Sequence, residues 1–362
     1  MRIAQISPLT EAVPPKLYGG TERVISWLTE ELVSLGHDVT LFASGDSATQ
    51  ARLVPVVERS LRLAAHRPDW LMWHTMVLDR VFASASDFDV IHFHVDYLHY
   101  PLARLCSTPC LTTLHGRLDL PDLVPLHRHF REQPLVSISQ SQRKPLADSR
   151  WVATVHHGLP ERLLSFCAEP GDYFAFVGRI SPEKRVDRAI EIAIATGTRL
   201  RIAAKVDRVD EAYFEREIRP LLGHPLIDYV GEIAQDAKNE FIGHARALLF
   251  PIDWPEPFGL VMIESLACGT PVVAYRCGSV PEIIEHGVTG YIVDDQSQAI
   301  DAARHIDRIA RGACRRAFES RFTARRMARR YLDVYQALSA ASPALLEPRT
   351  ATKMLTWAPR QV

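Results

Sequence analysis

Short apolar runs alternate with longer amphipathic stretches along most of the chain. After the first run, apolar residues recur every three or four positions from Val24 to Leu35, which predicts a helix that ends at Gly36. The next apolar run follows at once, so strand, helix and strand succeed one another as in a βαβ unit. This succession repeats, which predicts an α/β protein with mainly parallel sheets covered by helices on both faces. The expected strands span residues 3–7, 38–43, 88–94, 110–114, 135–139, 152–155, 173–177, 200–204, 227–230 and 247–250.

The chain length predicts more than one domain. Its 362 residues exceed what one hydrophobic core usually organises. Loop-forming residues gather in 160–171, which indicates a linker there. We therefore expect an N-terminal domain of residues 1–160, a second domain of residues 161–318, a helix at 319–340 and a loosely held tail at 341–362.

Composition excludes several classes of protein. The formal net charge of −1 argues against binding to a polyanion such as a nucleic acid, and the hydrophobic content of 47% excludes a disordered chain. The six cysteines show no C-x-x-C spacing, which favours reduced thiols inside the cell. The first residues lack the apolar stretch of a signal peptide, and no run of about 18 apolar residues occurs. We expect a cytoplasmic protein.

The most informative stretch, PIDWPEPFGLVMIESLACGTPVVA, holds two glutamates eight positions apart. The first lies in a loop and the second about a turn and a half into a predicted helix. A loop that feeds a helix N-terminus offers free N–H groups to a diphosphate, and carboxylates accept forked hydrogen bonds from hydroxyls. A ligand that carries hydroxyls at both ends and a diphosphate in the middle is a nucleotide sugar. The candidate binding residues are Glu256, Pro257, Phe258, Gly259, Leu260 and Glu264.

A second candidate site follows the strand at 173–177, in the segment GRISPEK. Ser181 is a predicted N-cap with Pro182 at the first helical position. Arg179 and Lys184 would then lie on either side of a helix N-terminus, where cations and free N–H groups suit a diphosphate. Lys205, at the carboxyl end of the next expected strand, is a candidate third phosphate contact.

Two further candidates come from the N-terminal half. Gly19 and Gly20 precede the first predicted helix and would let backbone approach a ligand closely, although glycine pairs more often serve a plain turn. His115 and Gly116 follow a strand at its carboxyl end, where ligands of α/β sheets gather.

Two apparent metal motifs do not carry a metal site. Asp87 and Asp89 match D-x-D, but they precede a strand, and ligands gather at the opposite, carboxyl end. His92, His94 and His99 lack a cysteine or carboxylate at ligand spacing, so we interpret them as strand histidines near a cleft.

Taken together, these motifs resemble those of family 4 retaining glycosyltransferases of GT-B fold. The resemblance rests on the E-x7-E pair with ACGTPVVA, on GRISPEK, on TLHG, on an IS-x-x-Q turn and on HHG, where His157 replaces the family's usual asparagine. It implies two Rossmann-like domains facing each other across a cleft, with the helix at 319–340 crossing back to the first domain.

The resemblance also implies roles for the site residues. Arg179 and Lys184 would stabilise the leaving diphosphate, and Glu264 would hold the ribose hydroxyls. Glu256 and His115 would contact the transferred sugar. The glycine loop would face the cleft and help to hold the acceptor or the donor phosphate. The loop that would read the base is Gly231, Glu232 and Ile233.

The function expected from this resemblance is metal-independent, retaining transfer of a hexose from a UDP- or GDP-sugar to an acceptor hydroxyl, with no cofactor. Two alternatives remain open. One is a nucleotide-sugar epimerase or phosphorylase of the same fold, and the other is a non-catalytic nucleotide-sugar binder. Base, sugar, acceptor and oligomeric state are not encoded in recognisable motifs.

The segment 304–330 is rich in arginine. The simpler interpretation is a solvated helical face. The alternative is peripheral contact with an anionic membrane surface at the inner face, but no stripe of tryptophan or leucine accompanies the arginines.

Overall fold

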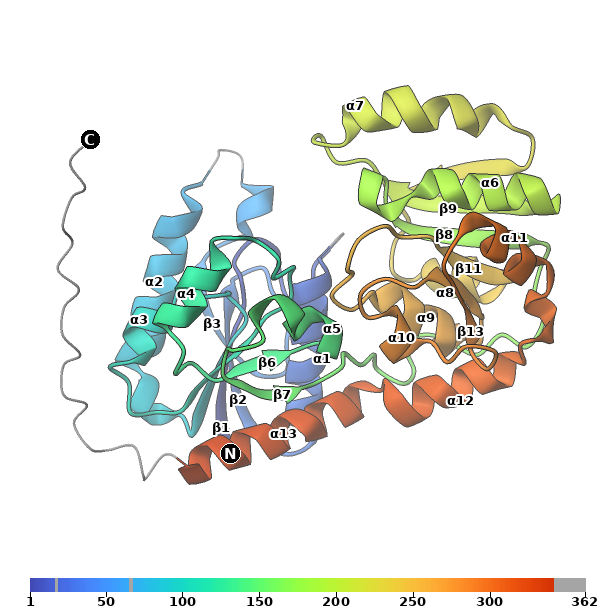
Figure 1. Cartoon of the computed structure of the whole chain (residues 1–362). Coiled ribbons are helices and arrows are strands. Elements are labelled where there is room, and N and C mark those ends of the chain that lie inside the picture. Colours follow the sequence, from blue (N-terminus) through green and yellow to red (C-terminus); the bar gives the residue numbers. More distant parts are fainter. Residues whose placement is uncertain (17–18, 65–67, 342–362) are drawn as a thin grey trace.

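The computed structural model of the chain describes residues 1–16, 19–64 and 68–341, and it is built on two parallel β-sheets. The first sheet has seven strands in the order β3-β2-β1-β4-β5-β6-β7, and the second has six in the order β10-β9-β8-β11-β12-β13. Helices cover both sheets, and the two sheets stand side by side (Figure 1). The predicted α/β fold with two parallel-sheet units is confirmed.

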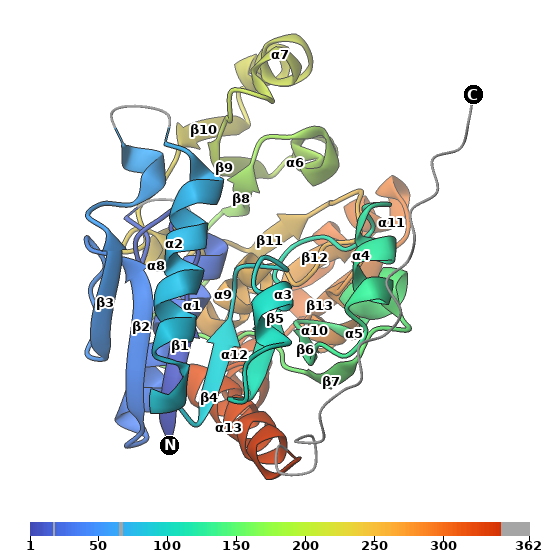
Figure 2. The same cartoon turned by 90° about the vertical axis from the view of Figure 1, so that its left-hand side faces the viewer.

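The first sheet belongs to the N-terminal part of the chain, and Figure 2 shows α2 in front of it. Its strands are β1 (Arg2–Ile6), β2 (Asp38–Ser44), β3 (Arg52–Val57), β4 (Val90–Phe93), β5 (Cys110–Thr113), β6 (Leu135–Ser137) and β7 (Trp151–Thr154). Its helices are α1 (Gly20–Ser34), α2 (Trp70–Ala83), α3 (Tyr100–Ala103), α4 (Leu123–His129) and α5 (Gln140–Arg143).

The second sheet begins after a connection of residues 155–172. Its strands are β8 (Tyr173–Arg179), β9 (Arg199–Lys205), β10 (Ile227–Gly231), β11 (Ala247–Phe250), β12 (Val272–Tyr275) and β13 (Gly290–Val293). The helices that follow are α6 (Val186–Thr196), α7 (Glu211–Tyr213), α8 (Lys238–Gly243), α9 (Leu260–Cys268), α10 (Val280–Ile283), α11 (Gln296–Arg304), α12 (Arg311–Arg321) and α13 (Ala324–Ala341).

The predicted strands are short runs in which apolar residues predominate, although β4 and β5 also bury His92, Thr112 and Thr113. β4, β5 and β11 are buried along their whole length, as expected for parallel strands between two helical layers. Strand β3 and helix α2 are two of the elements that were not predicted. Edge strand β3 is half-buried and contains Pro55, which weakens a strand pattern, and α2 leaves Trp70, Leu71 and Met72 exposed, so its apolar stripe is irregular.

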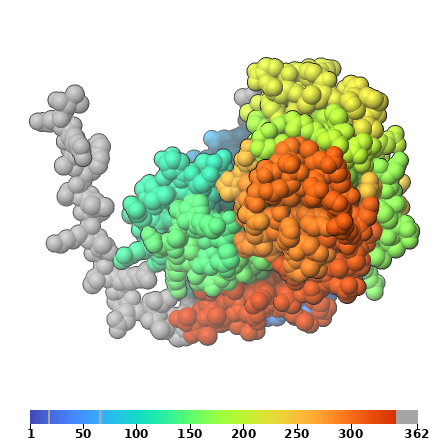
Figure 3. Space-filling view, turned by 45° about the vertical axis from the view of Figure 1, so that its right-hand side comes forward, coloured from blue at the N-terminus to red at the C-terminus, as the bar shows by residue number. Residues whose placement is uncertain are grey.

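The last helix, α13, returns to the first sheet. Leu159 pairs with the turn before α13, through Leu159 N–H to the Phe322 carbonyl (2.9 Å) and Ala324 N–H to the Leu159 carbonyl (2.7 Å). Beyond that turn α13 packs on α1 and β4. The space-filling view shows the red C-terminal helices running beneath both halves of the molecule (Figure 3).

Seven of the ten arginines in 304–330 are exposed, as a solvated helical face predicts, but three arginines of α12 depart from this prediction. Arg311 donates to the carbonyl oxygens of Cys167 and Ala245, and Arg315 donates to those of Leu164 and Ala267. Arg321 donates to the carbonyls of Ile283 and Glu282. The prediction fails for these three because backbone carbonyls of neighbouring segments come within reach of their long side chains.

No helix in the described ranges is long and apolar enough to cross a membrane. The predicted tail, 341–362, lies outside the described residues apart from Ala341, which ends α13.

Candidate active site

A cavity of about 690 Å³ opens between the two sheets, a size typical of small-molecule sites. Residues that follow β5, β6 and β7 line it from the first sheet, and residues at or after the carboxyl ends of β8, β9, β10 and β11 line it from the second. The predicted residues in this lining are Gly19, Gly20, His115, Arg179, Lys184, Lys205, Glu232, Ile233, Glu256, Pro257, Phe258, Gly259, Leu260 and Glu264. Gly231, the last residue of β10, lies outside the lining.

The Glu256 carboxylate forms an ion pair with the Lys184 ammonium, and the Trp254 indole N–H donates to the same carboxylate (3.0 Å). The Lys184 nitrogen also lies 5.1 Å from the centre of the Trp254 ring. Both charged side chains are largely buried, so the pair is weakly screened by solvent. Glu256, which was predicted to bind the sugar, and Lys184, which was predicted to bind the diphosphate, therefore contact each other directly.

Glu264 is paired in the same way, with a lysine that no motif indicated. Lys238, the first residue of α8, donates to the Glu264 carboxylate at 2.7 Å, and the Glu264 side chain is only 3% exposed. Arg23 of α1 also lines the cavity and interacts electrostatically with Glu264, and burial lowers the pKa of Arg23. Lys238 and Arg23 lie far from Glu264 in the sequence and follow no spacing rule.

Arg179 lies among carboxylates. It pairs with Glu183, and its guanidinium lies 3.7 Å from Asp207 and 3.4 Å from Asp210. Lys205 contacts Asp207 at 2.9 Å. A diphosphate at this point would bind among groups that are already partly neutralised.

Ser181 takes the predicted N-cap position with Pro182 in the first turn, but its side chain makes no capping hydrogen bond and the helix that it precedes is not the expected α-helix. Residues Pro182–Lys184 form a 3₁₀ turn, and α6 begins only at Val186. Between them Arg185 has a left-handed backbone (φ 52°), and its guanidinium is held by Asp187 (2.7 Å) and Asp253 (3.0 Å). These two ion pairs hold the side chain that follows the turn, so the α-helix starts after Arg185 rather than at Pro182.

The prediction that the loop of Pro257, Phe258 and Gly259 leads into a helix N-terminus is confirmed at α9. Gly259 precedes Leu260, the first residue of α9, with a left-handed φ of 78°, and no side chain caps this helix end. The backbone conformation requires glycine there, whereas an added Cβ would meet only side-chain atoms, the nearest being the flexible end of Met262 at 2.8 Å. The uncapped N–H groups of this helix end remain available to a ligand.

His115 enters the cavity from the first sheet and is held from behind by His94, with 2.8 Å between His115 Nε2 and His94 Nδ1. Burial lowers the pKa of His115 to about 3, so the ring is neutral. His157 stacks on His115 with ring centres 5.3 Å apart and contacts the Phe258 ring edge-to-face at 4.8 Å. His157, whose role the sequence left open, therefore belongs to the cavity wall.

Of the three histidines predicted to lie on a strand, only His92 does, since His94 follows β4 and His99 precedes α3, but all three are buried hydrogen-bonding groups. His92 bonds Tyr335 and Thr113, both at 2.7 Å, and His99 bonds Thr112 at 2.8 Å. Within residues 1–16, 19–64 and 68–341, no three His, Cys, Asp or Glu side chains gather in a way that could hold a metal ion. Asp89 accepts hydrogen bonds from Arg2, before β4 begins.

Comparison with known proteins identifies the family. A family model described as "Glycosyltransferase Family 4" matches residues 18–165, and one described as "Glycosyl transferases group 1" matches residues 167–324. The chain belongs to the family 4 glycosyltransferases. It is therefore a transferase, and the two matches meet at the connection between the two sheets.

Relatives of this family 4 glycosyltransferase span nearly its whole length. The N-acetyl-α-D-glucosaminyl L-malate synthase of Bacillus anthracis is 23% identical, over 88% of this chain and 93% of that protein. Sucrose-phosphate synthase of Thermosynechococcus elongatus superposes with a TM-score of 0.78 at 18% identity, over 94% of this chain and 99% of that one. Anabaena HepE in complex with UDP-glucose gives a TM-score of 0.69 at 15% identity, over 93% and 100%. These structures show the GT-B fold.

Proposed function

We propose that this glycosyltransferase moves a hexose from a UDP- or GDP-sugar to an acceptor hydroxyl with retention at the anomeric carbon and without a metal ion. The observation that carries the proposal is one cavity whose lining brings together three cations of the second sheet, Arg179, Lys184 and Lys205, with Glu256 and Glu264. A structural relative, Anabaena HepE, binds UDP-glucose, which supports a nucleotide-sugar donor.

Charge stabilisation is the main contribution that this site can make. The bond between the anomeric carbon and the β-phosphate oxygen breaks with both electrons going to the diphosphate. Arg179, Lys184 and the N–H groups at the start of α9 would stabilise the negative charge that develops there. These cations supply the role that a metal ion has elsewhere.

The sugar would lie between Glu256, on the second sheet, and His115, on the first. Glu256 would hold sugar hydroxyls or stabilise the positive charge of the oxocarbenium-like transition state, and neutral His115 can hydrogen-bond a hydroxyl. The acceptor oxygen would bond to the anomeric carbon on the face that the diphosphate leaves. Its proton would pass to the leaving phosphate, so no separate general base is required.

The ribose would bind at Glu264. Because Lys238 already occupies one carboxylate oxygen, a forked contact to both ribose hydroxyls would use the remaining acceptor sites of Glu264. The acceptor and the base are not specified by these contacts, and contact with an anionic membrane stays a prediction.

The phosphate assignment is tested by Arg179→Ala and Lys184→Ala, assayed as nucleotide release from UDP-, GDP-, ADP- and dTDP-glucose. We expect turnover to fall by about 100- to 1000-fold in each variant, as when a group that stabilises transition-state charge is removed. The matched control is Arg216→Ala, because Arg216 is exposed and pairs with Glu217. Near-normal turnover in both cavity variants would refute the assignment.

Calorimetric titration with UDP, GDP, ADP and dTDP identifies the base, with Glu264→Ala as the binding-deficient control. Tight binding of one nucleotide that is lost in the variant would support the ribose assignment. Binding of none would contradict a nucleotide-sugar donor.

A further inference from the structure

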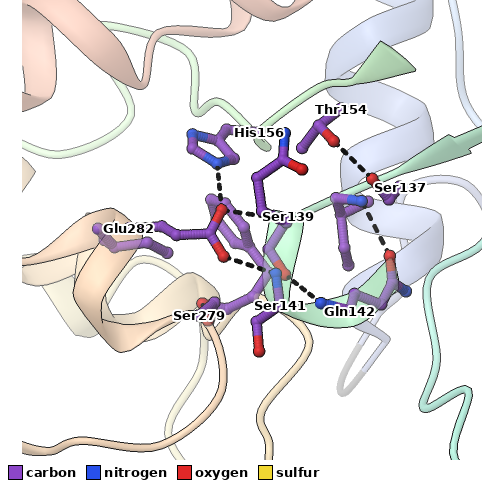
Figure 4. A network of polar contacts seen from close by, with 12 residues as sticks. Ser137, Ser139, Ser141, Gln142, Thr154, His156, Ser279 and Glu282 are labelled. Atoms are coloured by element: carbon purple, nitrogen blue, oxygen red, sulfur yellow. Dashed lines mark hydrogen bonds and ion pairs between the residues drawn. The ribbon is translucent and has the colours of Figure 1, made fainter. Parts of the chain in front are cut away.

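Glu282 lies on α10, in the half of the molecule built on the second sheet, but its carboxylate contacts α5 in the half built on the first sheet. One oxygen accepts a hydrogen bond from the Gln140 N–H (2.7 Å), and the other accepts one from the Ser141 N–H (2.8 Å). His156 Nε2 lies 3.2 Å from the first oxygen. Figure 4 shows the side chain reaching from α10 to these groups. A single carboxylate thus joins the two halves of the molecule beside the cavity.

On the first sheet, the segment that Glu282 contacts also holds the His115 loop. Gln142 of α5 donates from its amide nitrogen to the carbonyls of Leu114 and Gly116, both at 2.8 Å. These carbonyls lie on either side of His115. The same amide accepts from the Ile138 N–H through its oxygen (2.9 Å). Any shift of α5 would therefore move the backbone around His115.

On the second sheet, α10 is fixed to the loop that carries Glu256. The Ser279 N–H donates to the Glu256 carbonyl (3.0 Å), and the Ser279 hydroxyl donates to the Phe258 carbonyl (2.7 Å). An added Cβ at Gly278 would lie 2.3 Å from the Glu256 nitrogen, so the two backbones are in close contact. Glu282 thus extends from a turn that is bonded to the Glu256 loop.

The electrostatics of Glu282 favour a charged side chain between the two halves of the molecule. Burial alone would raise the pKa of Glu282, but hydrogen bonds from His156 and from the Gln140 and Ser141 N–H groups outweigh it. The pKa is held below its ordinary value, so the side chain is a carboxylate at neutral pH. Charge-assisted hydrogen bonds of this kind are stronger than neutral ones.

We propose that Glu282 is a positioning residue that holds the His115 loop of the first sheet against the Glu256 loop of the second. The proposal rests on the proposed function, because it assumes that both loops contact the same sugar. Glu282 itself lines no part of the cavity. It acts through α5 on one side and through Ser279 on the other.

Glu282→Gln is the main test, because the amide keeps the size of the side chain but offers a single acceptor oxygen to two N–H donors. We expect kcat for nucleotide release from the preferred nucleoside diphosphate glucose to fall about ten- to a hundredfold, given the usual strength of charged hydrogen bonds. The nucleotide Kd should stay within about twofold of wild type, since most of the proposed nucleotide contacts, among them Arg179, Lys184 and Glu264, are on the second sheet. The matched control is Glu285→Gln, because Glu285 pairs with Arg321 of the second half.

Gln140→Pro breaks the same contact from the opposite side. Gln140 is the first residue of α5, where proline is compatible with a helix, and extended Ser139 (φ −156°, ψ 161°) suits a residue before proline. This variant removes one N–H donor and leaves Glu282 intact. We expect a smaller loss of kcat, and in the double variant the two losses should not multiply.

The outcomes separate this proposal from the proposed function. A wild-type protein that binds none of the four nucleotides would overturn the proposed function and the coupling with it. A wild-type protein that turns over its donor, with Glu282→Gln and Gln140→Pro as active as Glu285→Gln, would overturn the coupling alone. Loss of nucleotide binding parallel to the loss of kcat would also overturn it, because that pattern indicates a general structural defect.

Discussion

At the scale of single residues, the two glutamates of the E-x7-E pair each meet a lysine. Glu256 pairs with Lys184, and Glu264 pairs with Lys238. GRISPEK made Lys184 predictable, but Lys238 is the first residue of an unremarkable short helix, and no local pattern marks it. Charge pairing across a fold depends on which elements become neighbours, so this half of the site could not be predicted from spacing.

Glu22, in the first turn of α1, gives a pH prediction. It is buried against Glu11 and Arg62, and burial raises the pKa of Glu22 from 4.5 to about 7. The folded state therefore binds the proton more tightly than the unfolded state. The contribution of protonated Glu22 to the free energy of unfolding is complete below pH 4.5 and is lost as the pH rises through 7. Ionising Glu22 in place costs about 3 kcal/mol at the usual rate of about 1.4 kcal/mol per pH unit.

We therefore expect Glu22→Gln to remove most of this loss, so that the variant exceeds the wild type in free energy of unfolding at pH 8 but not at pH 4.5. Urea unfolding at a series of pH values measures the difference. Exposed Glu58→Gln is the control and should leave the pH profile unchanged. Parallel profiles for wild type and Glu22→Gln would show that Glu22 ionises normally in the folded protein.

At the scale of elements, α13 docks on the first sheet through polar as well as apolar contacts. The Tyr335 hydroxyl bonds Gln5 Nε2 (3.0 Å) and His92 Nδ1 (2.7 Å), and the Tyr331 hydroxyl bonds Thr113 (2.9 Å). All five side chains are buried. Periodicity predicted that this helix exists, and the family resemblance implied its direction, but neither indicated that His92 would be its partner.

Tyr335→Phe tests this docking. The change keeps the ring and removes the hydroxyl, which leaves Gln5 and His92 without that partner in a buried position. We expect the free energy of unfolding to fall by about 2 kcal/mol, the usual cost of stranding buried polar groups. Urea unfolding measures it, with Tyr97→Phe as control because Tyr97 is exposed. An unchanged midpoint would mean that the hydroxyl contributes nothing to docking.

At the scale of the whole molecule, a net charge of −1 conceals a cationic cavity. Six cations face three carboxylates in its lining. The cations are Lys16, Arg23, Arg179, Lys184, Lys205 and Lys238, and the carboxylates are Glu232, Glu256 and Glu264. The balanced overall charge argues against a polyanion partner, which stays a prediction, but the composition could not reveal a local excess of positive charge where the two sheets meet.

This excess predicts a salt dependence. We expect the Kd for the preferred nucleoside diphosphate to weaken severalfold between 50 and 500 mM NaCl, because salt screens partly exposed cations. Lys205→Ala should reduce the slope of log Kd against log salt. Calorimetry at several salt concentrations gives both values. A Kd that does not change with salt would argue that hydrogen bonds rather than charge hold the diphosphate.

Local chemistry let the sequence determine most of the strands, the α/β class and the segments that carry Arg179, Glu256 and His115. Apolar runs, glycines and prolines act within a few residues of themselves, so their effects are visible in the chain. The tertiary structure alone decided the pairing of Lys238 with Glu264, the start of α6 at Val186 and the bridge from Glu282 to α5. Each depends on side chains that are brought together only when the sheets and their connections are in place.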